Sequence, residues 1–285
     1  MGIDINTARF LLWTRKHGVD FSSTVTLGRQ HMLLRPSQLE KAARGLSMDG
    51  NVSLSALAAA ARSMYGDSFF ECLGARDVQS IDASGYEQAT IIHDMNLPIQ
   101  SAREYSCVFD GGTLEHVFNV RTSFENCMRL VRVGGHVLHV LPSNNFFGHG
   151  FYQFSAEFFY RLYGAENGFE VRKLLLVEDC PGGKWLDVPD PSRLKRRIVF
   201  SNSLPTNVFV LARKLAQMSG ISKIPQQSDY EELSWIGRTG SVSRHALLRD
   251  FVRNSLPGAV GRVLLTLKHW TSRNRDIMAI DIDRE

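Results

Sequence analysis

Three aspartates stand at the ends of predicted strands, where a carboxylate can hold hydroxyl or amino groups. They are Asp82, Asp94 and Asp110. In an open α/β sheet, ligands bind beyond the carboxyl ends of the strands, close to the point where the strand order reverses. Asp82 is a candidate partner for the two hydroxyls of a ribose, because one carboxylate can accept from both. A turn-forming role in the Asp-x-Ser sequence at 82–84 explains the same residue equally well.

Asp94 is followed by Met95, and together the two side chains could surround a purine. The carboxylate of Asp94 could accept a hydrogen bond from an exocyclic amine, while Met95 forms an apolar wall against the ring. The alternative is that Asp94 caps the turn before Leu97 and Pro98. The sequence leaves both interpretations open.

The segment 142–159 carries polar and aromatic side chains that could enclose an acceptor molecule. Glycines at 148 and 150 could act as hinges, and a closing loop can exclude water from a reaction. His149 is a candidate general base, because its unperturbed pKa lies near neutrality, and Tyr152 is the second candidate catalytic residue. The candidate substrate-binding side chains on this loop are Asn144, Asn145 and Gln153. The alternative is that the four phenylalanines pack the loop and His149 only bonds the backbone.

The sequence contains no motif for metal binding or for a catalytic nucleophile. The four cysteines are scattered without a C-x-x-C pair, and no two histidines have the i, i+4 or H-E-x-x-H spacing of a metal site. Neither a G-x-S-x-G sequence nor a P-loop occurs. We therefore expect no metal ion. His93 and His139 lie inside apolar strands, and we expect both to be hydrogen-bonded core residues.

The overall composition is that of a globular protein, with 44% hydrophobic and 22% charged residues among 285. A chain of this length can bury a sizeable core without disulfides or a metal. Its 33 Lys and Arg exceed its 29 Asp and Glu by four, which is too small a surplus to argue for nucleic acid. No apolar run reaches the about 18 residues of a membrane span, and no signal-peptide core is present. We expect a cytoplasmic protein.

Short apolar runs and helix-like segments alternate along the first three quarters of the chain. The expected strands are 24–28, 78–84, 89–96, 105–111, 136–143, 169–179 and 207–214. The expected helices are 7–18, 37–46, 53–64, 67–74, 122–131 and 155–168. Such alternation requires crossover connections and predicts a mostly parallel sheet covered on both faces. Strands buried on both faces read as continuous apolar runs, as these do.

Residues 78–143 resemble class I S-adenosylmethionine-dependent methyltransferases. The resembling stretches are, in order, VQSIDAS, HDMNLPI, YSCVFDGGTLEHVFN and MRLVRVGGHVLHVLP. In that family a Glu-His pair often follows the fourth strand, as Glu115 and His116 do here, while Val133 stands where proline is common. The resemblance implies an α/β, Rossmann-like doubly wound sheet of about seven mostly parallel strands. It also implies S-adenosylmethionine as the cofactor.

The resemblance assigns roles to the residues that follow the strands. The candidate cofactor-binding residues are Gly28, Arg29, Gln30, Asp82, Ala83, Asp94, Met95, Asp110 and Gly111. Asp82 would hold the ribose, Asp94 with Met95 the adenine, and Gly28 with its neighbours the methionine end. Glu115 and His116 are counted with the substrate-binding residues, although a structural role as a helix cap is the alternative.

One departure from the family concerns the loop after the first strand. Family members have an acidic residue followed by Gly-x-Gly-x-Gly, whereas TLGRQHML has only Gly28. A long segment then precedes Asp82 where the family has one short helix, so we expect a helical insertion at about 31–77. Arg29 or Gln30 could contact the cofactor carboxylate instead, because a guanidinium matches that geometry. The alternative is that the site no longer binds S-adenosylmethionine.

Composition divides the chain into an α/β domain, 1–214, and a basic, mainly helical C-terminal extension, 215–285. Residues 238–275 contain eight Lys and Arg and one Asp, so their net charge is +7. We expect an amphipathic helix there that packs on the domain. The alternative is a helix that binds a partner or lies on an anionic membrane surface, which would place the protein at the inner face of the membrane.

Methyl transfer to a small molecule, a sugar or a lipid-linked glycan is the leading functional hypothesis. The acceptor class rests on analogy with the family and on the basic extension alone. A catalytically silent fold kept as a binding or assembly module is the second hypothesis, motivated by the missing glycines. A nucleotide-binding oxidoreductase is disfavoured, because no G-x-G-x-x-G follows a strand. We expect no nucleic-acid partner, and the sequence does not indicate the oligomeric state.

Overall fold

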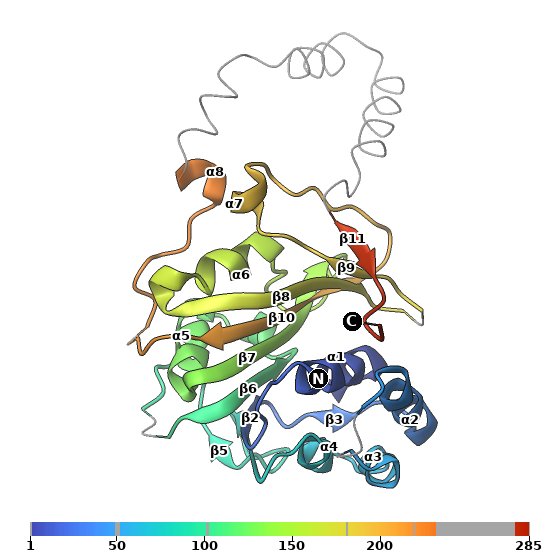
Figure 1. Ribbon diagram of the computed structural model, residues 1–285. Coiled ribbons are helices and arrows are strands. Elements are labelled where there is room, and N and C mark those ends of the chain that lie inside the picture. The colour runs from blue at the N-terminus through green and yellow to red at the C-terminus, as the bar shows by residue number, and fades with distance from the viewer. Residues whose placement is uncertain are drawn as a thin grey trace.

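The computed structural model describes residues 2–48, 52–100, 103–180, 182–218, 220–231 and 277–284. Its centre is a nine-stranded sheet with the order β11-β9-β8-β10-β7-β6-β2-β4-β5, whose strands are labelled in Figure 1. The strands are β1 Gly2–Ile3, β2 Ser23–Leu27, β3 His31–Met32, β4 Asp77–Asp82, β5 Ile91–Ile92, β6 Tyr105–Gly111, β7 Val131–Asn144, β8 Phe169–Glu178, β9 Trp185–Asp187, β10 Thr206–Lys214 and β11 Met278–Ile280. The short β1 and β3 pair with each other in a separate two-stranded sheet.

The neighbours β5, β4, β2, β6 and β7 are parallel to one another. β10 lies between β7 and β8 and is antiparallel to both, and β9 is antiparallel to β8 and β11. Seven of the nine strands therefore run in one direction, as the sequence predicts for a mostly parallel sheet. The chain order reverses between β2 and β6, so the carboxyl ends of these two strands border the point where α/β sheets bind ligands.

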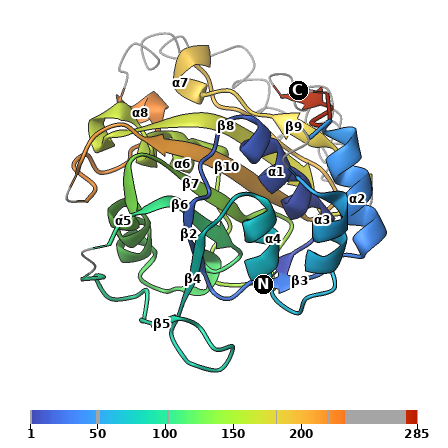
Figure 2. The same ribbon diagram turned by 60° about the horizontal axis from the view of Figure 1, so that its bottom comes forward.

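Helices cover both faces of the sheet. They are α1 Ile5–Lys16, α2 Pro36–Gly45, α3 Leu54–Ala60, α4 Asp67–Cys72, α5 Val120–Leu130, α6 Ala156–Leu162, α7 Pro191–Leu194 and α8 Ser228–Glu231, with 3-10 turns η1 Leu114–His116 and η2 Ala165–Asn167. Figure 2 shows α1 to α4 gathered on one side of the sheet and α5 on the other. This is the layered arrangement expected for an α/β sheet with crossover connections.

Two apolar cores lie on the two faces, and successive residues of β6 point into different cores. Cys107 and Phe109 pack with α1 to α4, whereas Val108 packs with α5 and α6. All seven residues of β6 are buried, which explains why its sequence is a continuous apolar run. The expected strand 105–111 is confirmed at both ends.

The helical insertion expected at 31–77 is confirmed and consists of α2, α3 and α4 between β2 and β4. Two other expectations need correction. The strand expected at 89–96 is limited to Ile91–Ile92, because the chain turns immediately afterwards at Asp94. β7 begins at Val131, directly after α5, five residues before the expected start at 136.

The C-terminal end of the chain returns to the sheet, which the sequence did not indicate. β11 pairs with β9 through Met278 and Asp187, and the buried Ile282 joins the core beneath α1 and α2. Asp283 forms an ion pair with Arg9 of α1 at 3.0 Å. The last part of the predicted extension is therefore a strand of the main sheet.

The basic helix predicted within 238–275 lies outside the described residues, so its membrane or partner contact stays a prediction. None of the helices in the described part of the chain has the length and apolar character that a membrane crossing requires.

Candidate functional site at the carboxyl ends of the strands

Gln30 fills the space between the ends of β2 and β6. Its side chain is buried, and Nε2 donates to the carbonyl of Leu27 at 2.7 Å. Its Oε1 accepts from no group in the described part of the chain. A β-carbon at Gly111 would lie only 2.5 Å from this oxygen. Gly111 is therefore required here because it makes room for Gln30, at the point where a cofactor-binding role was predicted for both.

Gly28 and Arg29 connect β2 to the helical insertion. Gly28 has a φ of +68° and donates its N–H to the carbonyl of Ile81 at 2.7 Å. The Arg29 guanidinium pairs with Asp67 at 3.2 Å and lies over the ring of Tyr65, 4.0 Å from its centroid. A cofactor carboxylate would have to compete with Asp67 for this guanidinium.

Asp82 ends β4 and is half-buried, while Ala83 is exposed. Asp82 Oδ1 accepts from the N–H of Ser84 at 3.0 Å, which is the Asp-x-Ser turn that the alternative interpretation predicts. This turn uses one carboxylate oxygen and fixes the direction of the side chain at the strand end. Because one oxygen is used in this way, a ribose would be held through the other.

Asp94 is exposed, and its Oδ1 accepts from both the backbone N–H and the side-chain amide of Asn96, at 2.9 and 2.8 Å. These hydrogen bonds lower the pKa of Asp94. Met95 is buried in the core, where its carbonyl accepts from the Ser123 hydroxyl and its sulfur lies 3.9 Å from the amide nitrogen of Asn126. The expectation that Met95 forms an open apolar wall is therefore wrong, because its side chain packs beneath α5.

Asp110 begins a buried chain of hydrogen bonds. Its Oδ2 lies 2.8 Å from His139 Nδ1, and His139 Nε2 lies 2.7 Å from the Tyr163 hydroxyl. Because a carboxylate accepts, Nδ1 donates to it and Nε2 accepts from the tyrosine. The other carboxylate oxygen of Asp110, Oδ1, accepts from the N–H of Thr113 at 3.0 Å. The expectation that His139 is a hydrogen-bonded core histidine is confirmed, and the Asp110 carboxylate points into the protein.

Glu115, His116 and His149 form a second cluster beside the first. Glu115 is 1% exposed, and its Oε1 lies 3.3 Å from His149 Nε2 and 3.7 Å from His116 Nε2. Burial, with the charge of Asp110 as a second cause, raises the pKa of Glu115 to about 8. Burial also lowers the pKa of His116, with a smaller contribution from His149. This cluster brings together a candidate base and the Glu-His pair, which are 33 residues apart in the sequence.

Gly150 seats the loop after β7 on η1. Its φ is +69°, and a β-carbon there would lie 2.8 Å from the carbonyl oxygen of Glu115. The same carbonyl accepts from the N–H of Phe151 at 2.7 Å and from that of Tyr152 at 3.3 Å. Only a residue that tolerates this φ and has no side chain fits such a close approach. The hinge predicted at Gly150 is thus the contact that brings His149 to Glu115.

The amides predicted to bind substrate hold the loop in place. Asn144 and Asn145 both donate to Oδ1 of Asn202, at 2.9 and 3.1 Å, and Gln153 Oε1 accepts from the N–H of Phe146 at 2.9 Å. Asn202 was missed by sequence reasoning. No motif marks it, because its role depends on the approach of a segment distant in the chain.

Three exposed phenylalanines lie on the two chain segments that form the second cluster. Phe147 and Phe151 belong to the loop after β7, and Phe118 follows η1. Phe118 and Phe151 make an edge-to-face contact with ring centroids 6.1 Å apart, and the Tyr152 hydroxyl donates to the carbonyl of Phe118 at 2.7 Å. The alternative that all four phenylalanines pack the loop is thus wrong for Phe147 and Phe151. Their rings add exposed apolar surface to the loop that carries His149.

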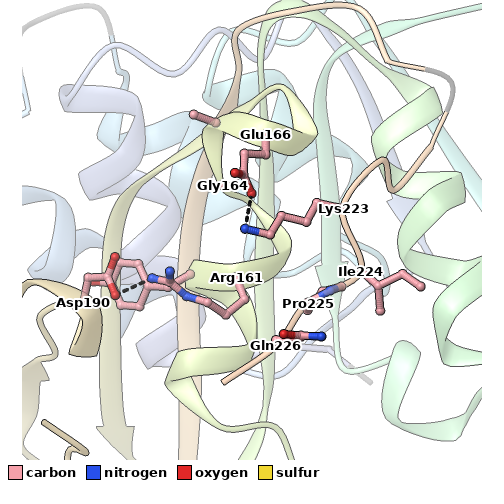
Figure 3. A pocket seen from close by; sticks show the side chains of 10 residues that line it. Arg161, Gly164, Glu166, Asp190, Lys223, Ile224, Pro225 and Gln226 are labelled. Carbon is pink, nitrogen blue, oxygen red and sulfur yellow. Dashed lines mark hydrogen bonds and ion pairs between the residues drawn. The ribbon is translucent and has the colours of Figure 1, made fainter. Parts of the chain in front are cut away.

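Two cavities lie near β7 and α6. One, of about 290 Å³, lies between the end of α6 and residues 223–226, where Arg161 pairs with Asp190 and Lys223 with Glu166 (Figure 3). The other, of about 280 Å³, lies at the carboxyl end of β7 and is lined in part by Ser143 and Asn144. The second is the one that adjoins the loop carrying His149.

No protein-family model and no curated protein matches the sequence. The fold is similar to solved structures of methyltransferases. One is the N-methyltransferase NodS from Bradyrhizobium japonicum in complex with S-adenosyl-L-homocysteine, at 10% identity and a TM-score of 0.38, covering 73% of this chain and 86% of that one. Another is geranyl diphosphate methyltransferase in complex with S-adenosylmethionine, at 13% identity and a TM-score of 0.38, covering 74% and 85%.

The chain has a Rossmann-like, doubly wound fold. The strand order and the antiparallel β10 between β7 and β8 decide this. The fold class expected from the resemblance to class I methyltransferases is therefore confirmed, with two further strands, β9 and β11, at one edge.

Proposed function

We propose that this chain is an S-adenosylmethionine-dependent methyltransferase acting on a small molecule, a sugar or a lipid-linked glycan. The observation that carries the proposal is the order of acidic strand ends around the reversal point of the sheet. Asp82 ends β4, and Asp94 follows β5. This is the order in which a nucleoside cofactor needs partners for its ribose and its base.

In this proposal the cofactor lies across the ends of β2, β4 and β5. The free oxygen of the Asp82 carboxylate holds the ribose, and Asp94 accepts from the adenine amine. The turn at Gly28 faces the methionine end, with the guanidinium of Arg29 shared between Asp67 and the cofactor carboxylate. Gln30, for which Gly111 makes room, packs beneath the turn at Gly28.

The reaction moves a methyl group from the sulfonium to an acceptor atom, and the sulfur keeps the electron pair of the broken bond. The chain therefore needs no nucleophile of its own, and its main task is to align the acceptor with the methyl–sulfur bond. If the acceptor is a hydroxyl, its proton passes to a base. His149 is the candidate base, because Glu115 orients its ring through Nε2 and half of its side chain remains exposed.

The surface around His149 favours an acceptor with an apolar or ring-shaped part. Phe118, Phe147 and Phe151 offer exposed aromatic rings on the same two segments as His116 and His149, and such rings pack against apolar groups or the faces of sugars. The cavity at the end of β7 offers polar groups from Ser143 and Asn144. Both features suit a small molecule or a glycan.

Calorimetric titration with S-adenosylmethionine and S-adenosylhomocysteine tests the proposal. We expect binding that Asp82→Ala weakens by roughly tenfold or more, since a hydrogen bond to a charged group contributes about 1.5–3 kcal/mol. Asp20→Ala is the matched control. Asp20 makes the same turn with Ser22, at 2.8 Å, but precedes β2 at the opposite edge of the sheet. An equal effect of both variants would contradict the proposed site.

A catalytically silent binding module is the second candidate, favoured by the packing after β2. Gln30 fills the space between β2 and β6, and Arg29 is already paired with Asp67. The absence of any binding to metal-free and ligand-free protein, up to millimolar cofactor, would favour this module over the enzyme.

A further inference from the structure

The side chains of Glu115, His116 and His149 converge on one point at the carboxyl edge of the sheet. Their three ligand atoms lie within 4.8 Å of one another, the only such set of three acid, histidine or cysteine side chains in the part of the chain that the structure describes. Ligands 2.0–2.1 Å from a tetrahedral ion are about 3.3 Å apart. Glu115 Oε1 lies 3.3 Å from His149 Nε2 and 3.7 Å from His116 Nε2.

The carboxylate of Glu115 has an unused buried oxygen. The side chain is 1% exposed, and Oε2 has no hydrogen-bond partner among the described residues. A buried polar atom without a partner loses its hydration and gains nothing in return. A cation bound by the carboxylate would stabilise its charge in this buried position. This observation is independent of the distances within the cluster.

The backbone fixes two separate segments against each other around this point. Glu115 and His116 are consecutive in η1, and the carbonyl of Glu115 accepts from the N–H groups of Phe151 and Tyr152. Gly150 allows the close approach. Ligands carried by rigidly docked segments keep their relative positions, which is what a metal site requires.

We propose that Glu115, His116 and His149 form a binding site for a first-row divalent transition metal such as Zn²⁺. Two imidazoles favour zinc, iron, cobalt or nickel over magnesium, which prefers oxygen ligands. Three protein ligands leave at least one coordination position open. His116 and His149 are 45% and 53% exposed, so the open position faces the solvent side of the cluster.

The open position suits an oxygen of the acceptor, and this part of the inference rests on the proposed methyltransferase function. A metal would orient that oxygen and help to remove its proton. A neutral imidazole that ligates a metal through Nε2 carries its proton on Nδ1 and has no nitrogen left to accept another, so metal binding would replace the role of His149 as a base. Metal binding itself does not depend on the methyltransferase proposal.

Titration of full-length, tag-free protein with Zn²⁺ and Co²⁺ tests the site, with Co²⁺ binding followed by its visible absorption. We expect one ion per chain, and we expect His116→Ala and His149→Ala each to weaken its affinity by roughly tenfold or more. His31→Ala is the matched control, because His31 Nε2 contacts Glu87 Oε1 at 2.8 Å in a surface pair without a third ligand. It should leave the affinity unchanged.

Binding that none of these variants changes, or that His31→Ala weakens equally, would overturn the site. Tight binding of Mg²⁺ in preference to Zn²⁺ would overturn the proposed metal class. Circular dichroism checks that the variants fold, which their exposed positions favour. Cofactor calorimetry on the same samples separates the two proposals. Zinc binding without cofactor binding supports the metal site and contradicts the enzyme. Cofactor binding without zinc binding supports the enzyme and contradicts the metal site.

Discussion

Two acid–histidine clusters lie a few residues apart at the end of β6, and they differ in how completely their polar atoms are used. In the first, Asp110, His139 and Tyr163 are buried, and both carboxylate oxygens and both ring nitrogens have partners. In the second, Glu115 is buried with one oxygen that has no partner among the described residues, while the two histidines are half exposed. Similar side chains thus form a fully hydrogen-bonded network in the first cluster and a partly hydrogen-bonded one in the second.

The difference follows from the elements that carry the histidines. His139 lies opposite Asp110 in the parallel ladder between β6 and β7, so the strand register itself sets their contact. His149 lies on a loop and meets Glu115 only because Gly150 docks there. A complete buried network fixes the fold, whereas an incomplete one beside solvent can accept a ligand. Variants in each cluster test whether the two clusters differ in this way.

Asp110→Ala should have the largest effect on stability. It leaves the buried ring of His139 without its acceptor, and the loss of one partner of a buried polar pair costs about 3 kcal/mol. Urea denaturation measures the free energy of unfolding. Asp20→Ala, which removes an exposed ion pair with Arg132 and the hydrogen bond from the N–H of Ser22, is the control and should lower it by about 1 kcal/mol or less. A loss below about 1 kcal/mol for Asp110→Ala would show that the first cluster is not a stabilising network.

His136, in the same strand as His139, should give a pH dependence. Burial, and then the charges of Arg213 and Arg172, lower the pKa of His136 to about 4. Between pH 6.5 and 4 the unfolded chain binds a proton that the folded chain does not, so stability falls as the pH falls. From pH 7 to pH 5 this contributes a loss of about 1–2 kcal/mol.

His136→Gln should remove that part of the slope, because glutamine does not titrate. Urea denaturation of both proteins at pH 5 and pH 7 gives the comparison. If the free energy of unfolding fell equally between pH 7 and pH 5 in the variant and the original protein, His136 would not be the cause of the pH dependence.

Tyr163→Phe should cost about 1 kcal/mol, since it removes one neutral hydrogen bond to His139 from the buried network. Tyr152→Phe is the counterpart in the loop. Its hydroxyl donates to the carbonyl of Phe118 in an exposed position, so the loss of unfolding free energy should be smaller. Thermal unfolding of the two variants ranks them, and an equal loss would remove the distinction between network and loop.

Glu115→Gln should cause the smallest loss of stability in the metal-free protein. Oε2 has no partner to lose among the described residues, and the amide keeps an oxygen near His149. Because burial raises the pKa of Glu115 to about 8, replacing this group with a neutral amide should increase the free energy of unfolding at neutral pH, or decrease it by less than about 0.5 kcal/mol. A loss as large as that of Asp110→Ala would mean that Glu115 belongs to a satisfied network after all.

The sequence predicted the elements whose signal is local. β6 is a continuous apolar run buried on both faces, and its ends match the expectation. The helices of the insertion also have local signals, such as the alanine-rich stretch of α3. The position of Asp82 at a predicted strand end marked it as a residue to inspect, and the resemblance to class I methyltransferases added the Glu115–His116 pair. Asp82 ends β4, and the pair lies in η1 after β6.

Features that depend on distant segments were not predictable in this way. Neither Asn202 nor the pairing of β11 with β9 has a sequence signal, because each needs a partner far along the chain. The burial of Gln30 against Gly111 requires the strand order to be known first. The spacing rules found no metal motif, since His149 joins Glu115 and His116 through the fold and not through the sequence.

The return of the C-terminal end to the sheet changes how the segment 232–276 is connected. α8 precedes it, and β11 with Ile282 follows it. The described residues on both sides of this segment are therefore held by the α/β domain. A single cut within the segment would turn an intramolecular contact into an association of two chains, so that the thermal midpoint would come to depend on protein concentration.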